Sequence, residues 1–149
     1  MRLRAFLVAV GVAATLGGTA ALVLPGVASA RVVTRTVVVT SVLDRQVNFT
    51  RNTGILSDTD YNTARKVVGY DSVRFIYNRH TNRTTYEIAL TIERGFVYGV
   101  VTQRGNRPVM RGRIRWGTGL FRGVAGTIVA RNLNSKGTQT GVTLRFHRR

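Results

Sequence analysis

The 149-residue chain contains no cysteine, only two prolines, and six acidic residues against 23 lysines and arginines. Without cysteine it can form neither a disulfide framework nor a thiolate metal site, so its stability must come from a packed core and a hydrogen-bonded backbone. No window after residue 31 shows the period of a long amphipathic helix, which argues against a helical bundle. The formal net charge of +17 will attract anionic polymers or surfaces whatever the function.

The first 30 residues have the pattern of a secretory signal peptide. Arg2 and Arg4 give a positive start, an apolar segment runs to Leu24, Pro25-Gly26 breaks it, and Ala28-Ser29-Ala30 forms a cleavage site with small residues. The alternative is an uncleaved membrane anchor, because the apolar segment is about long enough to span a bilayer. We expect cleavage after Ala30 and a secreted, extracellular product consisting of one domain, 31–149.

Alternating apolar and polar residues, many of them β-branched, predict short antiparallel strands throughout the mature chain. The expected strands are 32–42, 67–78, 84–93, 96–103, 112–116, 123–131 and 138–147. With no helix to cover a face, seven or eight strands predict an all-β fold that closes into a small antiparallel barrel of about eight strands. Residues 43–66 are expected to form a long loop near one mouth, with one short strand at 46–50.

Motifs for metal binding or nucleophilic catalysis are missing from the sequence. Asp58, Asp60 and Asn62 have the spacing that opens a calcium loop, but the glycine and glutamate required further along are lacking, so an Asx-rich turn is predicted. His80 and His147 lie in or beside predicted turns with no second ligand nearby, and we expect both to be solvated. No metal and no cofactor is therefore predicted.

Segment 116–128 is the most distinctive part of the chain. It carries Phe121 between two pairs of glycines, Gly117 with Gly119 and Gly123 with Gly126. The first pair suits a chain reversal with positive φ, the second suits a close backbone approach or a bulge, and Phe121 would fill the space that they leave. The segment resembles the GGTGxFxxAxG signature of plant dirigent proteins and the GGSGxFxGAxG signature of allene oxide cyclases, which share one barrel superfamily. Trp116 stands where both signatures begin with glycine.

The resemblance covers roughly residue 65 to the C-terminus. Val67-Val68-Gly69, Tyr86-Glu87-Ile88 and the segment 95–101 follow one another in the order of the same superfamily, whereas the N-terminal third does not align. The resemblance implies a secreted barrel that binds a small hydrophobic or phenolic ligand. Any enzymatic activity would be isomerase-like or cyclase-like and would act largely by confinement. The families carry an acidic residue on an early strand, and Asp44 is the acid in that region here.

Strand alternation supplies the other candidate site residues. On strand 67–78, Asp71 and Tyr77 share one face while Tyr70 and Arg74 share the other, and one of these faces must line the lumen. Glu87 lies on the polar face of the next strand, where it is either an acid or base in a polar lumen or a surface partner of an arginine. The catalytic candidates are therefore Glu87, Asp44 and Asp71, and the ligand-binding candidates are Tyr70, Arg74, Tyr77 and Tyr98.

The basic residues are arginines except Lys66 and Lys136, and they are scattered singly through the strands. Arginine suits phosphate and carboxylate groups, but no nucleic-acid-binding motif is present and we expect no specific nucleic-acid partner. The alternative to a ligand-binding barrel is a non-catalytic exported protein that binds anionic cell-wall polymers or polysaccharide through its basic surface. A cationic antimicrobial protein is less favoured, because cationic helices are lacking. Homo-oligomerisation is left open.

Overall fold

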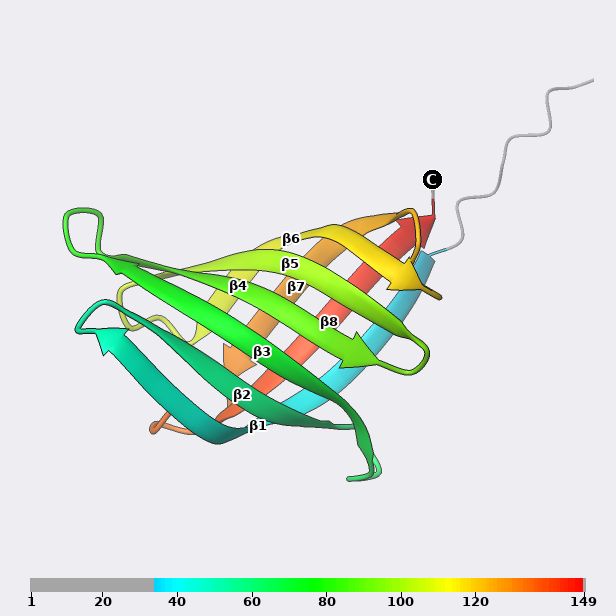
Figure 1. Cartoon of the computed structure of the whole chain (residues 1–149), viewed down its shortest axis with the longest axis horizontal. Helices are drawn as coiled ribbons and strands as arrows, with labels where there is room; N and C mark the ends of the chain where they lie inside the picture. Colours follow the sequence, from blue (N-terminus) through cyan, green and yellow to red (C-terminus); the bar gives the residue numbers. More distant parts are fainter. Residues whose placement is uncertain (1–33, 149) are drawn as a thin grey trace, which may run out of the picture. The chain divides into compact units, whose positions relative to one another are not determined.

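The computed structural model describes residues 34–148, which form one closed barrel of antiparallel strands (Figure 1). The strands are β1 (Thr34–Thr50), β2 (Thr53–Tyr61), β3 (Val67–Asn78), β4 (Arg83–Ile92), β5 (Gly95–Arg104), β6 (Val109–Gly119), β7 (Val124–Asn132) and β8 (Gln139–Arg148). Each strand pairs with the next one along the chain, and β8 pairs with β1 to close the barrel. The predicted all-β barrel is confirmed.

The predicted leader and the cleavage site after Ala30 lie outside the described residues. Within 34–148, no helix is long and apolar enough to cross a membrane.

The prediction of a long loop at 43–66 is wrong, although the short strand expected within it at 46–50 is present as the end of β1. The first strand continues to Thr50, and the chain then turns at Arg51 and Asn52 into β2. A bulge at Asp44, where the register with β2 shifts between Leu43 and Arg45, lets β1 bend without ending. The sequence pattern did not reveal β2 because polar residues occupy both of its faces, so the segment resembles a loop.

The predicted Asx-rich turn at 58–62 is wrong for its two aspartates and correct for Asn62. Asp58 and Asp60 lie within β2, and both side chains are directed into the barrel. Asn62 lies in the turn after β2, where its side-chain oxygen accepts hydrogen bonds from the backbone amides of Ala64 and Lys66, each at 2.9 Å. These two bonds give the backbone amides a hydrogen-bond acceptor where the chain reverses toward β3.

The barrel interior is filled mainly by aliphatic side chains at alternate positions of the strands. Every strand except β2 contributes to the buried core, which consists of Val39, Val73, Ile88, Leu90, Ile92, Val97, Val101, Met110, Ile114, Phe121, Ile128, Ala130, Val142, Leu144 and Phe146. The inward face of β2 carries Asp58 and Asp60, whose direct partners on β3 are Asp71 and Gly69. The polarity of the interior is therefore concentrated beside this one strand.

The turn between β6 and β7 closes one end of the barrel, as the glycine-rich pattern predicted. Phe121 is only 1% exposed, and the centre of its ring lies 5.2 Å from that of Phe146. Gly119 has a φ of +57°, and a Cβ added there would lie 2.1 Å from the carbonyl oxygen of Arg94. Phe121 thus plugs the barrel, and the turn that holds it depends on Gly119.

The four glycines divide their roles differently from the prediction. Positive φ occurs at Gly119 and Gly123, whereas Gly117 and Gly126 are required by close backbone approach. A Cβ added at Gly126 would lie 2.0 Å from the carbonyl oxygen of Arg145 on the paired strand β8.

Replacing Gly126 with alanine is expected to destabilise the barrel by about 2 kcal/mol, because the added methyl group forces β7 and β8 apart. The matched control is Gly141→Ala on β8, where the nearest atom to an added Cβ is a leucine methyl group of Leu133 at 3.4 Å. Urea unfolding of both variants measures the difference. Equal stabilities for the two variants would show that the close approach of β7 and β8 at Gly126 does not exclude a side chain there.

Candidate functional site

A cavity of about 280 Å³ occupies the barrel at the end opposite to Phe121. Its wall has an apolar part and a polar part, and it includes Ser41, Gln46, Leu56, Asp58, Asp71, Val73, Phe75, Tyr86, Ile88, Ala130, Asn132, Gly137, Thr140 and Val142. Gln46 and Gly137 are exposed, so the cavity opens to solvent beside the β7–β8 turn. The barrel therefore has one plugged end and one open mouth.

Three aspartates from two adjacent strands lie on the polar side of the barrel interior. Asp58 on β2 is the direct cross-strand partner of Asp71 on β3, and Asp60 follows two residues later on the same inward face of β2. Asp60 is fully buried, and one of its oxygens accepts a hydrogen bond from the Ser41 hydroxyl at 2.5 Å. Alternation brings these carboxyls together because positions two apart on a strand share a face.

Three carboxyl oxygens of this cluster have no hydrogen-bond partner within the described chain: Asp58 Oδ1, Asp60 Oδ2 and Asp71 Oδ1. Asp71 is only 8% exposed, and both Asp58 and Asp71 line the cavity. An unpartnered polar group in a protein interior costs about 1–3 kcal/mol. Asp58 and Asp71 therefore place two carboxyl groups at the cavity wall, and one oxygen of each has no partner within the described chain.

Burial and mutual repulsion make these carboxyls unusually weak acids. Burial raises the pKa of Asp71 to about 8, with further increases from the nearby charges of Asp60 and Asp58. Burial and then the charges of Asp60 and Asp44 raise the pKa of Asp58 to about 6. The pKa of Asp60 is also raised by burial, although the hydrogen bond from Ser41 opposes the increase. Near pH 7, Asp71 is therefore largely neutral while Asp58 is largely ionised.

On β4, next to the strand of Asp71, the cavity wall is held by a short hydrogen-bond chain. The Tyr86 hydroxyl donates to Gln103 Oε1 at 2.8 Å, and Gln103 Nε2 donates to the Arg107 carbonyl oxygen at 2.7 Å. Burial raises the pKa of the Tyr86 hydroxyl. Because this hydroxyl is already bonded to Gln103, Tyr86 presents mainly its ring to the cavity.

All seven predicted site residues lie within 34–148. Of these, Asp71 alone lines the cavity. Tyr77 has the same inward parity on β3, but its hydroxyl donates to Asn82 Oδ1 at 3.3 Å in the turn beyond the barrel wall.

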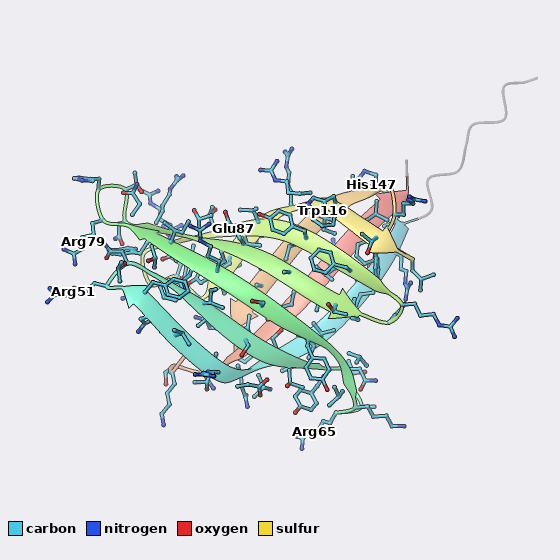
Figure 2. All side chains as sticks on the ribbon, in the orientation of Figure 1. Arg51, Arg65, Arg79, Glu87, Trp116 and His147 are labelled. Carbon is cyan, nitrogen blue, oxygen red and sulfur yellow. The ribbon has the colours of Figure 1, made fainter. Side chains whose placement is uncertain are left out.

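The other two carboxylates on the predicted list face outward. Glu87 lies 3.5 Å from the Arg74 guanidinium on the outer wall, which is the surface pairing that the sequence left open as the alternative. Glu87 is labelled in Figure 2. Asp44 is the bulged residue of β1, and its carboxylate accepts a hydrogen bond from the Thr59 hydroxyl at 2.6 Å. Neither carboxylate lines the cavity, because strand parity directs Glu87 outward and the bulge exposes Asp44.

The remaining ligand-binding candidates also lie on the outer wall. Tyr70 is exposed, and Tyr98 places its ring against Trp116 with ring centres 5.7 Å apart. Their parity is opposite to that of Asp71 and Val97, whose side chains are buried inside. A role in ligand binding for Tyr70, Arg74, Tyr77 and Tyr98 stays a prediction that the cavity geometry does not favour.

Sequence reasoning missed several polar residues of the site, among them Ser41, Gln46, Asp58 and Asp60. No alternation of apolar and polar residues marked the last two, because the inward set Gly54, Leu56, Asp58 and Asp60 is no more apolar than the outward set Ile55, Ser57, Thr59 and Tyr61. Gln46 could not be placed inside, since the bulge at Asp44 reverses the parity of β1. Over residues 34–148, no group of three His, Cys, Asp or Glu side chains is arranged to hold a metal ion.

Solved structures with the same barrel include proteins that act on small molecules. No family model matches the sequence, and no curated protein matches it significantly. Pyocyanin demethylase is 16% identical with a TM-score of 0.62, covering 75% of this chain and 99% of its own. The Diels-Alderase AbmU from Streptomyces koyangensis is 13% identical with a TM-score of 0.63, and the match covers 82% of this chain and 72% of AbmU. The pterocarpan synthase dirigent protein GePTS1 is 12% identical with a TM-score of 0.54, and the match covers 78% of this chain and 84% of GePTS1. At these identities the similarity establishes the fold, and it confirms the resemblance to the dirigent barrel at that level.

Proposed function

We propose that this barrel binds a small hydrophobic or phenolic molecule in its cavity and directs the cyclisation or isomerisation of that molecule by confinement. The observation that carries the proposal is the pair of carboxyl groups of Asp58 and Asp71 at the wall of an open cavity, each with one oxygen that has no partner within the described chain. Polar groups are retained in such a place when a ligand or water can bond to them. The barrels of a Diels-Alderase and of a dirigent protein, which share the fold, support the proposal.

The two carboxyls offer a ligand complementary hydrogen bonds near neutral pH. Asp71, with its pKa near 8, can donate a proton to an oxygen of the ligand, while ionised Asp58 can accept one from a hydroxyl group. A phenol or enol can make both bonds, since its hydroxyl both donates and accepts. A neutral carboxylic acid can also polarise a carbonyl group, and it would act as the acid in an isomerase-like or cyclase-like reaction.

Confinement is the second element of the proposed mechanism. The apolar part of the wall, formed by Leu56, Val73, Ile88 and Val142, faces the ligand body while the carboxyls hold its polar end. Phe121 closes the far end, so a ligand can enter and leave only at the open mouth. Holding reactive groups in one conformation lowers the entropic part of the barrier and excludes water. Secretion of the protein remains part of the proposal and depends on the leader pattern at 1–30.

The test uses 4-hydroxychalcone as a defined, achiral and flexible phenolic probe. Binding in one conformation is expected to give an induced circular-dichroism band at wavelengths where the protein does not absorb. Unsubstituted chalcone is expected to bind about tenfold more weakly, because it lacks the hydroxyl that bonds to the aspartates. The anionic 4-carboxychalcone is expected to be excluded by ionised Asp58.

Two tryptophan substitutions on β8 provide the control. Thr140→Trp fills the cavity from its wall and is expected to abolish the induced band, whereas Thr143→Trp on the opposite face of the strand is expected to preserve it. If the wild-type protein gave no induced band, or if both variants retained it, the cavity would not be the binding site.

A further inference from the structure

A second hollow lies on the outer wall of the barrel, where β6 and β7 separate. Within the described chain, the β6–β7 pairing runs from Val109 opposite Arg131 to Ile114 opposite Gly126. Beyond that point the end of β6 stays paired with β5, while the start of β7 stays paired with β8. The strands diverge over a groove of about 860 Å³, which is distinct from the internal cavity.

The floor of the groove is formed by small and apolar residues, and basic residues lie along its sides. Its floor includes Gly117, Val124 and Gly126, and the exposed basic residues along it are Arg113, Arg115, Arg145 and His147. No acidic residue lines it. The two ion pairs found in residues 34–148, Arg35 with Glu93 and Arg74 with Glu87, lie elsewhere. The groove therefore combines several unneutralised arginines with room for a ligand between them.

One tryptophan lies at the side of this groove, and it is the single tryptophan of the chain. The register of β5 and β6 shifts at Arg115, so the next residue, Trp116, faces outward although Ile114 is buried inside. The Trp116 ring is 50% exposed, and it packs against Phe96 and Tyr98 with ring centres 5.1 and 5.7 Å apart. Figure 2 shows Trp116 and His147 near one end of the barrel, away from Arg51 and Arg79 at the other.

We propose that this groove binds an acidic polysaccharide, with sugar carboxylates on Arg113 and Arg145 and a sugar ring stacked on Trp116. Arg113 and Arg145 flank Thr127 in one row of the sheet, so their backbones are two strand spacings apart, about 10 Å. That separation suits carboxylates on alternate sugars of an extended chain. The planar guanidinium forks suit carboxylates, and the aromatic ring provides a flat apolar face.

A single-stranded nucleic acid fits the groove less well. Such strands are bound by several aromatic rings that stack successive bases, whereas Trp116 is the one exposed Phe, Tyr or Trp side chain among the residues that line the groove. The inference is independent of the internal cavity, because the groove and the cavity share no lining residue. The inference identifies the groove as the part of the basic surface that contacts an anionic polymer.

The experiment uses Trp116 fluorescence as a local reporter while polygalacturonate is titrated into the full protein. A saturable change is expected with polygalacturonate and none with neutral dextran. A variant with Arg113→Gln, Arg115→Gln and Arg145→Gln is expected to bind about tenfold more weakly or worse. The matched variant with Arg51→Gln, Arg65→Gln and Arg79→Gln carries the same net charge and is expected to bind within about twofold of the wild type.

A second pair of variants keeps the test decisive if the triple variant fails to fold. Thr127→Glu places a carboxylate between Arg113 and Arg145 and is expected to weaken binding, whereas Ser72→Glu on the exposed face of β3 is expected to leave it unchanged. Equal weakening by the two members of either pair would show attraction by net charge alone and would overturn the proposal. An unchanged Trp116 signal, or tighter binding of single-stranded poly(dT), would also overturn it.

Discussion

The variant Asp71→Asn is expected to be more stable than the wild type at pH 9, on the order of 5 kcal/mol, and to differ little from it at pH 4. The pKa of Asp71 is about 8 in the barrel against an ordinary value of 3.8. This difference of about four pH units corresponds to about 5 kcal/mol at 1.36 kcal/mol per unit. Asparagine has nearly the same shape but cannot ionise, so it avoids that cost.

The sign follows from the number of protons bound in each state. Between about pH 4 and pH 8 the folded protein keeps the Asp71 proton while the unfolded chain loses it, so the wild-type stability falls as the pH rises through this range. Asp58 adds a smaller loss between about pH 4 and pH 6. Urea unfolding of both proteins at several pH values measures the effect.

The control for this experiment is Glu87→Gln, which removes a carboxylate from the outer wall and leaves the carboxyls of Asp58, Asp60 and Asp71 intact. We expect it to retain the pH dependence of the wild type. Parallel stability curves for Asp71→Asn and the wild type would mean that Asp71 does not hold its proton near neutral pH, and the acid role proposed for it would fail.

Replacing Phe121 with alanine is expected to destabilise the barrel by about 3–5 kcal/mol. The ring is 1% exposed and packs against Phe146 at the plugged end, so its removal leaves a cavity that the surrounding strands cannot readily fill. A loss of this size is a large part of the stability of a small domain. Thermal and urea unfolding measure the loss.

The neighbouring residue gives a matched control for the plug. Leu120 lies in the same turn but is 52% exposed, and Leu120→Ala is expected to change the stability by about 0.5 kcal/mol or less. If Phe121→Ala were no more destabilising than Leu120→Ala, the ring would not act as a plug, and the closed end of the proposed ligand cavity would need another explanation.

The sequence was sufficient for the barrel because each of the strands that it predicted buries an apolar face of period two. The exception was β2, whose inward positions carry Asp58 and Asp60. A rule that places apolar residues inside cannot identify a strand whose inner face carries carboxyl groups. The same exception explains why Asp71 was found and its cross-strand partner Asp58 was not.

By itself the sequence determined the all-β class, the order of most strands, the glycine-rich closure around Phe121 and the excess of arginine, because these depend on local alternation, backbone freedom and composition. Only the tertiary structure decided which face of β2 is inside and which residues of β1 and β6 face inward beyond their bulges. Single-residue bulges at Asp44 and Arg115 reverse that choice for Gln46 and Trp116, and no local pattern marks them. The raised pKa of Asp71 likewise required the closed barrel, because it arises from burial beside carboxyls brought close by strand pairing.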